Sequence, residues 1–240
     1  MANQQVSSAL EDYLKVIWGM HEWGIEQVTV KALAERMGYA PSSVSEAIKK
    51  MTAAGLVKHE KYRGITLSEE GTNIAVGMVR RHRIIETFLV EYADYSWDEV
   101  HEEAEVLEHA VSDRLIDAIW VKLGKPERDP HGDPIPDAAG VLPQGKVVAL
   151  TDLAVGEQAR IVQISDRSSE LLQFCEANGL LPGAIVKVTA LRPVLGMMSM
   201  ELTELAPVNS GFEEIAEVAV GRQIELGTVA AEALRVQVLA

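Results

Sequence analysis

Residues 41–71, PSSVSEAIKKMTAAGLVKHEKYRGITLSEEG, decide the fold of the first third of this 240-residue chain. Pro41 suits the first turn of a helix, Gly55 suits its end, and small polar residues follow Pro41. Two short β-prone runs come next, at 56–59 and 65–67, on either side of a charged turn. A helix followed by a two-stranded ribbon is typical of a recognition helix and its wing.

The residues before this stretch predict two further helices. Residues 7–23 carry an apolar stripe of Leu10, Leu14, Ile17 and Trp18, and residues 30–37 form a shorter amphipathic segment. A glycine is placed to end each of them. Helices joined by short turns and closed by a β-ribbon predict a winged helix-turn-helix.

Charge is unevenly distributed along the chain, whose formal net charge is −14. Residues 27–66 contain seven bases and three acids, whereas 91–140 contain four bases and fourteen acids. The first segment suits a polyanionic partner and the second suits cations. Helical periodicity leaves the polar side chains at the start of the recognition helix exposed and able to meet the major groove: Ser42, Ser43, Ser45 and Glu46. The bases of the helix and the wing are expected to contact phosphates: Lys49, Lys50, Lys58, Lys61 and Arg63.

The acidic segment contains a pattern typical of metal ligands. Helices are expected at 68–92, 97–112 and 113–123. His101, Glu105, Glu108 and His109 fall on one face of the second of these, because their offsets are 0, 4, 7 and 8. The preceding helix contributes His82 and Glu86 at i and i+4. Together these imidazoles and carboxylates are enough to hold two cations.

After the proline-rich loop at 125–145 the texture changes to β-branched runs separated by glycines. Strands are expected at 157–164, 184–191, 198–205, 214–220 and 231–239, with a helix near 169–177. This pattern predicts a small β-barrel of the SH3-like kind. The fold class is therefore α+β and multidomain.

Several residues receive a structural interpretation only. The single cysteine, Cys175, is expected to be a buried apolar side chain, and Met197, Met198 and Met200 to pack in a core strand. His21, His59 and His131 have no partner at ligand spacing and are expected at the surface. The chain shows no signal-peptide pattern and no apolar stretch near 18 residues, which predicts a cytoplasmic protein without membrane contact.

The chain resembles the diphtheria toxin repressor and manganese transport regulator family of metal-dependent repressors. The resemblance is carried by six stretches: ALEDYLKVIW (9–18), PSSVSEAIKKM (41–51), EKYRGITLSEEG (60–71), MVRRHRIIETFL (78–89), VHEEAEVLEHAVSD (100–113) and GDPIP (132–136). It implies a winged helix at 1–74, a helical metal-binding and dimerisation domain at 75–142, a linker at 143–152 and an SH3-like domain at 153–240. It also implies a homodimer that binds a palindromic operator and represses genes of metal-ion homeostasis.

The resemblance implies two metal sites in each chain. The primary, activating site would take Asp12 from the first helix with Glu105, Glu108 and His109. The ancillary site would take His82, Glu86 and His101, together with Glu170 and Gln173 of the SH3-like domain.

Two residues of the primary site indicate the metal preference. This chain has Asp12 and Glu105 at positions where iron-responsive members of the family have Met and Cys. Hard carboxylate oxygens suit Mn(II), so two Mn(II) per chain are predicted, with Fe(II) or Co(II) as possible substitutes. Lys15 stands where small manganese-responsive members have a Glu ligand, which favours a primary and ancillary pair over a paired manganese site.

Three alternatives stay open on the sequence alone, one of which is that the SH3-like domain serves mainly as a peptide-binding module. The chain could be an iron-responsive regulator or a winged-helix regulator that needs no metal. A hydrolytic metalloenzyme is disfavoured, because the run lacks HExxH and the two Glu-x-x-His motifs of a di-iron centre.

Overall fold

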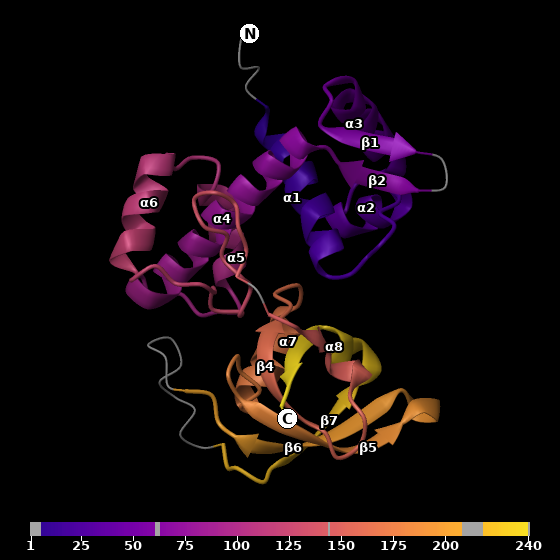
Figure 1. Cartoon of the computed structure of the whole chain (residues 1–240), viewed down its shortest axis with the longest axis vertical. Helices are drawn as coiled ribbons and strands as arrows, with labels where there is room; N and C mark the ends of the chain where they lie inside the picture. The colour runs from indigo at the N-terminus through magenta and orange to yellow at the C-terminus, as the bar shows by residue number, and fades with distance from the viewer. Residues whose placement is uncertain (1–5, 61–62, 144, 208–217, 240) are drawn as a thin grey trace. The chain divides into compact units, whose positions relative to one another are not determined.

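The computed structural model describes residues 6–60, 63–143, 145–207 and 218–239 (Figure 1). Contacts divide the chain into two compact units, Met1–Arg81 with Pro136–Val141 and His82–Ile135 with Leu142–Ala240. Helix α4 (Glu69–Tyr92) begins in one unit and ends in the other. No helix within the described ranges is both long and apolar enough to cross a membrane.

The first unit is a winged helix-turn-helix, as the sequence predicts. Its elements are α1 (Ser8–Glu22), α2 (Val30–Met37), α3 (Pro41–Ala53), β1 (Val57–Glu60) and β2 (Gly64–Leu67), followed by the start of α4. The Thr29 hydroxyl caps α2 by accepting from the Ala32 amide, and Gly38 ends it with a left-handed φ of 67°. Leu14, Ile17 and Ile48 are almost fully buried between the helices, so the apolar stripes do form the core.

Two glycines of α4 give a matched test of packing in this unit. A Cβ on Gly71 would collide with the Leu56 carbonyl oxygen, whereas one on Gly77 would meet nothing within 4 Å. We expect Gly71→Ala to destabilise the unit by about 2 kcal/mol or more, in the range of overpacking changes. Gly77→Ala should instead stabilise it by up to about 1 kcal/mol through helix propensity. Chemical denaturation followed by circular dichroism checks both, and equal effects would contradict the packing assigned to Gly71.

The second unit begins with a small helical layer. The last turns of α4 pack against α5 (Val100–Leu107) and α6 (Asp113–Lys122) through Ile84, Val100 and Ile116. The predicted helix at 97–112 is too long, because α5 ends at Leu107. Ser112 adopts an extended conformation and its hydroxyl caps α6 by accepting from the Leu115 amide, so the chain turns between the two helices.

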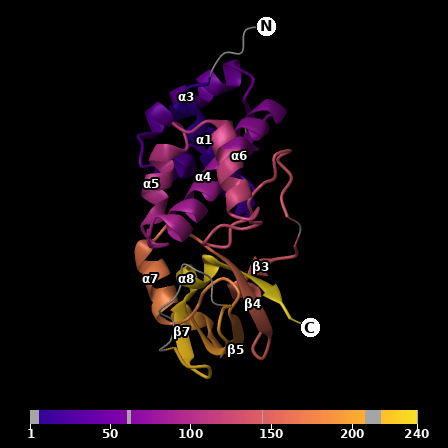
Figure 2. The same cartoon turned by 90° about the vertical axis from the view of Figure 1, so that its left-hand side faces the viewer.

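The rest of the second unit is an SH3-like sheet (Figures 1 and 2). Its strands pair in the order β3-β8-β4-β5-β6-β7, with every pairing antiparallel. They are β3 (Val148–Ala149), β4 (Gln158–Ile164), β5 (Ile185–Arg192), β6 (Met197–Glu204), β7 (Gln223–Gly227) and β8 (Leu234–Val238). The helical elements are η1 (Leu150–Asp152), α7 (Ser169–Ala177), η2 (Pro193–Leu195) and α8 (Thr228–Glu232).

Most β predictions are confirmed, and so is the helix at 169–177. Cys175 and Met200 are fully buried in the sheet's core and Met198 is 3% exposed. The strand expected at 214–220 is not confirmed. Residues 214–217 lie outside the described residues, and residues 218–220 do not form a strand. The fifth strand in sequence is β7, at 223–227, whose Ile224 and Leu226 supply the inward alternation.

The loop between α6 and the sheet is seated on β4. The Ile164 amide donates to the His131 carbonyl at 2.9 Å. Gly132 has a φ of 86°, and a Cβ there would collide with the Val162 carbonyl oxygen, so glycine is required for this close approach. Trp97, which precedes α5, is buried with the core residues of the sheet, and its indole donates to Glu176 on α7 at 3.1 Å. These contacts fix the helical layer against the sheet.

Candidate metal centre and DNA-binding surface

Helix α3 displays the face that was predicted to meet DNA. The apolar side chains of Val44, Ile48 and Met51 are buried, so the polar side chains of the helix point outward. The residues of α3 predicted to contact DNA are all exposed: Ser42, Ser43, Ser45, Glu46, Lys49 and Lys50. Such a surface of short hydroxyl side chains with two lysines suits phosphate contact and shallow base readout in a major groove.

The wing adds further positive charge to this unit. Lys58 on β1 is exposed, and Arg63 is exposed at the start of the returning strand. Arg63 Nη1 lies 3.6 Å from Glu60 Oε2, a solvent-exposed pair of the kind that is worth little to stability. Its guanidinium can therefore exchange that partner for a phosphate at small cost. Lys61 lies outside the described residues.

A group of metal donors, two of them buried and two half-buried, lies where α4 and α5 meet the end of β4. His82 and Glu86 point inward one turn apart, with 7% and 1% of their surfaces exposed. His82 Nε2 is 2.9 Å from Glu86 Oε1 and 3.1 Å from His101 Nδ1. Asp166 completes the group, with its Oδ2 3.0 Å from His101 Nδ1. All four offer a ligand atom within 4.8 Å of one another.

Asp166 is a residue that the sequence reasoning missed. It lies two residues after the end of β4, and a carboxylate just beyond a buried strand was the available signal. Glu170 and Gln173, which the resemblance implied for this role, lie exposed on α7. Gln173 Nε2 donates to Asp98 Oδ2 at 2.7 Å, and Glu170 belongs to none of the close donor groups formed by the described residues.

The surface position expected for His131 is wrong, because its side chain is fully buried. His131 Nε2 donates to the Trp97 carbonyl at 2.6 Å, which turns Nδ1 toward Glu86 Oε2 at 3.8 Å. Glu86, Asp129 and His131 form a second close group of donors, all buried. His131 Nδ1 and Asp129 Oδ2 have no hydrogen-bond partner among the described residues. Helical spacing could not reveal this group, since two of its members come from an irregular loop.

Burial and mutual charge shift the acid–base behaviour of these groups strongly. Burial alone would raise the pKa of Glu86, but His82, His101 and His131 hold it well below the usual range. Burial alone would lower the pKa of His101 and of His131. Asp166 and Glu86 nevertheless raise the pKa of His101 to about 11. Glu86 and Asp129 likewise raise the pKa of His131 to about 10. Burial, with Asp133 and Glu86 nearby, raises the pKa of Asp129.

These shifts predict that metal binding releases protons. His101 and His131 are imidazolium ions at neutral pH without metal, and a ligating nitrogen must be deprotonated. Metal affinity should therefore rise with pH until these imidazoles lose their protons, at about pH 10 for His131 and about 11 for His101. The stability that the raised pKa of His131 gives the metal-free chain has the opposite trend, being complete below about 6.5 and lost as pH rises through about 10.

Calorimetry in buffers of different ionisation enthalpy measures this release directly. At pH 7.5 we expect net proton release on metal binding, of up to two protons per chain, from His101 and His131. A buffer-independent enthalpy would contradict the protonation states assigned to His101 and His131.

The other predicted donors of the helical layer lie on the last turn of α5 or directly after it. Glu108 is fully buried, and its Oε2 accepts from His82 Nδ1 at 2.6 Å. His109 Nε2 lies 3.6 Å from Glu108 Oε1, and Glu105 forms a close donor group with His82 and Glu108. Asp12 lies on α1 in the other unit, half-buried, and its role as a ligand stays a prediction.

The chemistry of the donors fits a hard divalent cation. The close groups of the second unit contain imidazole nitrogens and carboxylate oxygens, which suit Mn(II), Fe(II), Co(II) and Zn(II). The one thiol of the chain, Cys175, is buried in the core of the sheet, where burial raises its pKa to about 12. That thiol is unsuited to act as a ligand, because a metal needs the thiolate.

A winged helix with a cationic face, joined to a helical layer that gathers metal donors, defines a metal-dependent DNA-binding regulator. Three family models match the chain in order. The N-terminal DNA-binding domain of iron-dependent repressors matches residues 5–65, and their metal-binding and dimerisation domain matches 68–137. The FeoA domain matches residues 148–238.

Individual relatives agree with these matches. The iron-dependent repressor IdeR of Mycobacterium tuberculosis is 30% identical over 190 residues, covering 74% of this chain and 82% of its own. A solved manganese-dependent transcriptional repressor in complex with manganese is 43% identical, with a TM-score of 0.86 over 96% of this chain and 100% of its own. ScaR with bound Cd²⁺ is 30% identical, with a TM-score of 0.78 over 95% and 98%. The chain belongs to the diphtheria toxin repressor family of metal-dependent transcriptional repressors.

Proposed function

We propose that the chain is a manganese-dependent transcriptional repressor that acts as a homodimer on a palindromic operator in the cytoplasm and controls genes of metal-ion homeostasis. The observation that carries this proposal is the donor set of the second unit, which consists of carboxylates and imidazoles without sulfur. Oxygen-rich donor sets suit Mn(II), which binds most weakly among the first-row divalent ions from Mn(II) to Zn(II) and must be selected by ligand type and geometry. The similarity to a repressor solved with manganese supports the same metal.

The way the donors are grouped supports our proposal of two metal ions per chain. The primary site would use Asp12, Glu105, Glu108 and His109, as the family resemblance implies. The ancillary site would use His82, Glu86 and His101, and we place Asp166 there in preference to Glu170 and Gln173. Asp129 and His131 approach the same Glu86 from the other side and widen the choice of ligands for that ion. No catalytic role is proposed for either site.

The mechanism rests on where the ligands lie in the chain. Asp12 belongs to the winged-helix unit, whereas Glu105, Glu108 and His109 belong to the unit that carries the helical layer. Asp12, Glu105 and Glu108 are acidic, so bringing them together without a cation costs free energy, and the metal-free chain samples many orientations of its winged helix. The bound cation supplies that charge. The chain's own ligands then hold one orientation, and the two winged helices of a dimer keep the spacing that operator half-sites require.

His82 connects the two sets of ligands. Its Nδ1 donates to Glu108 and its Nε2 faces Glu86 and His101. Because one nitrogen's hydrogen bond fixes the state of the other, engagement of His82 Nε2 in the ancillary site keeps the Nδ1 proton directed at Glu108. The ancillary ligands thereby orient a primary ligand.

The test is a metal titration of DNA binding. Protein stripped on a chelating resin is used to select duplexes from a random pool with Mn(II), and the recovered palindrome is then titrated with Mn(II), Fe(II), Co(II) and Zn(II). We expect binding only with metal, and activation by Mn(II) at concentrations where the protein remains a dimer. Equal binding by the stripped protein would favour a metal-independent regulator. Activation by Fe(II) at much lower free concentration than Mn(II) would favour an iron-responsive one.

A further inference from the structure

A cavity of about 460 Å³ lies beside the donor groups, within the second unit. It is bounded by the end of α4, by the loop that precedes the sheet, and by β4 with the turn before β5. Its volume falls in the range of small-molecule sites. Much of its wall is apolar, and the side chains that form this wall are Val90, Pro126, Pro130, Ile161 and Pro182.

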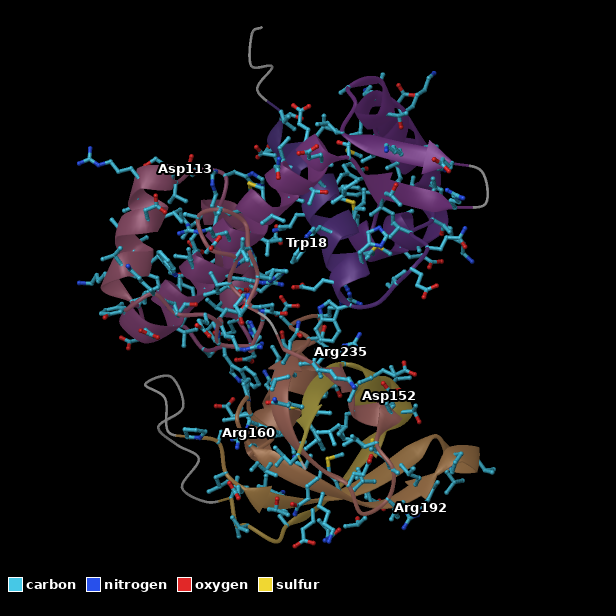
Figure 3. All side chains as sticks on the ribbon, in the orientation of Figure 1. Trp18, Asp113, Asp152, Arg160, Arg192 and Arg235 are labelled. Atoms are coloured by element: carbon cyan, nitrogen blue, oxygen red, sulfur yellow. The ribbon has the colours of Figure 1, made fainter. Side chains whose placement is uncertain are left out.

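Two guanidinium groups line the same cavity. Arg128 Nη1 donates to the Gly132 carbonyl at 2.6 Å, and Arg160 Nη1 donates to the Gly183 carbonyl at 3.0 Å. Both arginines are half-buried, and Figure 3 labels Arg160 on the sheet. Neither forms an ion pair with a carboxylate in the described part of the chain, although each has five N–H donors. Half-buried guanidinium groups with unused donors are well suited to carboxylate and phosphate groups.

The cavity also contains acidic side chains, and these narrow the chemistry of a ligand. Asp129 Oδ2 lies 3.7 Å from Arg83 Nε, so that carboxylate already faces a cation of its own. Glu91 is exposed at the rim and offers an acceptor to a hydroxyl or ammonium group. A ligand with a second anionic group near Glu91 would be repelled by that carboxylate. We therefore favour a ligand whose single anionic group lies near the arginines.

We infer that this cavity binds a small organic anion whose carboxylate or phosphate group engages Arg128 and Arg160. Its carbon skeleton lies against Val90 and Ile161. The cavity shares Asp129 with the donors around Glu86. Arg128 and Arg160 belong to no donor group, and occupation of the cavity does not require that any metal be bound. The ligand class is defined by an anionic group joined to a short carbon chain.

Isothermal calorimetry on the full-length, metal-stripped protein tests the inference. The probes are butyrate, glycerol 3-phosphate, inorganic phosphate and butyramide, the last being the neutral counterpart of butyrate. We expect saturable binding of butyrate or glycerol 3-phosphate at millimolar concentration or below, and none of butyramide. The stronger of the two organic probes tells carboxylate from phosphate. Equal binding of butyramide, inorganic phosphate as tight as the organic anions, or no saturable binding at all would overturn the inference.

Variants identify the groups responsible. Arg128→Gln and Arg160→Gln should each weaken binding about tenfold or more, and the matching lysine variants should lose less. Arg192→Gln is the control, because Arg192 pairs with Glu225 at 2.7 Å and is drawn at a well-separated place on the sheet (Figure 3). Near-ultraviolet circular dichroism establishes that each variant is folded. Unchanged affinity in both folded glutamine variants would refute the assignment of the arginines.

Discussion

Replacing Asp12 by Ala is expected to abolish manganese-dependent operator binding. Asp12 is the proposed ligand on α1, and the remaining primary ligands all belong to the other unit. Without it, metal still binds the helical layer but no longer restricts the winged helix. If the competent orientation falls from dominant to about 1% of the population, operator affinity falls on the order of 100-fold.

The matched control is Glu11→Ala, which removes the same charge one position earlier on α1 and therefore from another face of the helix. Electrophoretic mobility shift with and without manganese measures both variants. The tethering mechanism would be refuted by an Asp12→Ala protein whose operator binding keeps the manganese dependence of the parent.

The second large effect is expected at Glu86. Its carboxylate is 1% exposed, and it faces His82 at 2.9 Å, His101 at 3.3 Å and His131 at 3.8 Å. Glu86→Gln leaves buried imidazolium groups without their shared counter-charge, and breaking a buried pair in this way costs about 3–5 kcal/mol. The variant should also lose one of the two proposed manganese ions, because Glu86 belongs both to the group with His101 and Asp166 and to the group with Asp129 and His131.

Chemical denaturation of the metal-free protein and metal analysis after equilibrium dialysis check these two effects. Glu102→Gln, at an exposed position on α5, is the control and should change neither quantity appreciably. A Glu86→Gln protein that retains parental stability and two manganese ions would show that Glu86 is not shared between ligands.

The sequence predicts elements well where one periodicity decides them. The apolar stripes of α1 and α3, the glycine at the end of α2 and the alternation in β4 to β6 place most elements within a few residues. The spacing of His82 and Glu86 likewise brings both side chains inward from one helix face. In each case the information lies within a single regular element.

What the sequence could not give depends on contacts between distant segments. Asp166 joins His101 only because β4 ends beside α5, and His131 is buried only because its loop lies on β4. The early end of α5 depends on the competing cap at Ser112. None of these produces a period in the sequence, and the irregular loop that carries Asp129 and His131 has no pattern that predicts burial.

The position of Trp97 has a consequence for how the C-terminal part can be handled. The indole fills a place in the hydrophobic interior of the sheet although it is contributed from upstream, before α5. A fragment that starts at residue 143 would lack this ring, and removing a buried tryptophan leaves a void worth about 3–5 kcal/mol. The SH3-like domain therefore folds cooperatively with the helices before it. We expect the isolated domain to be only marginally stable.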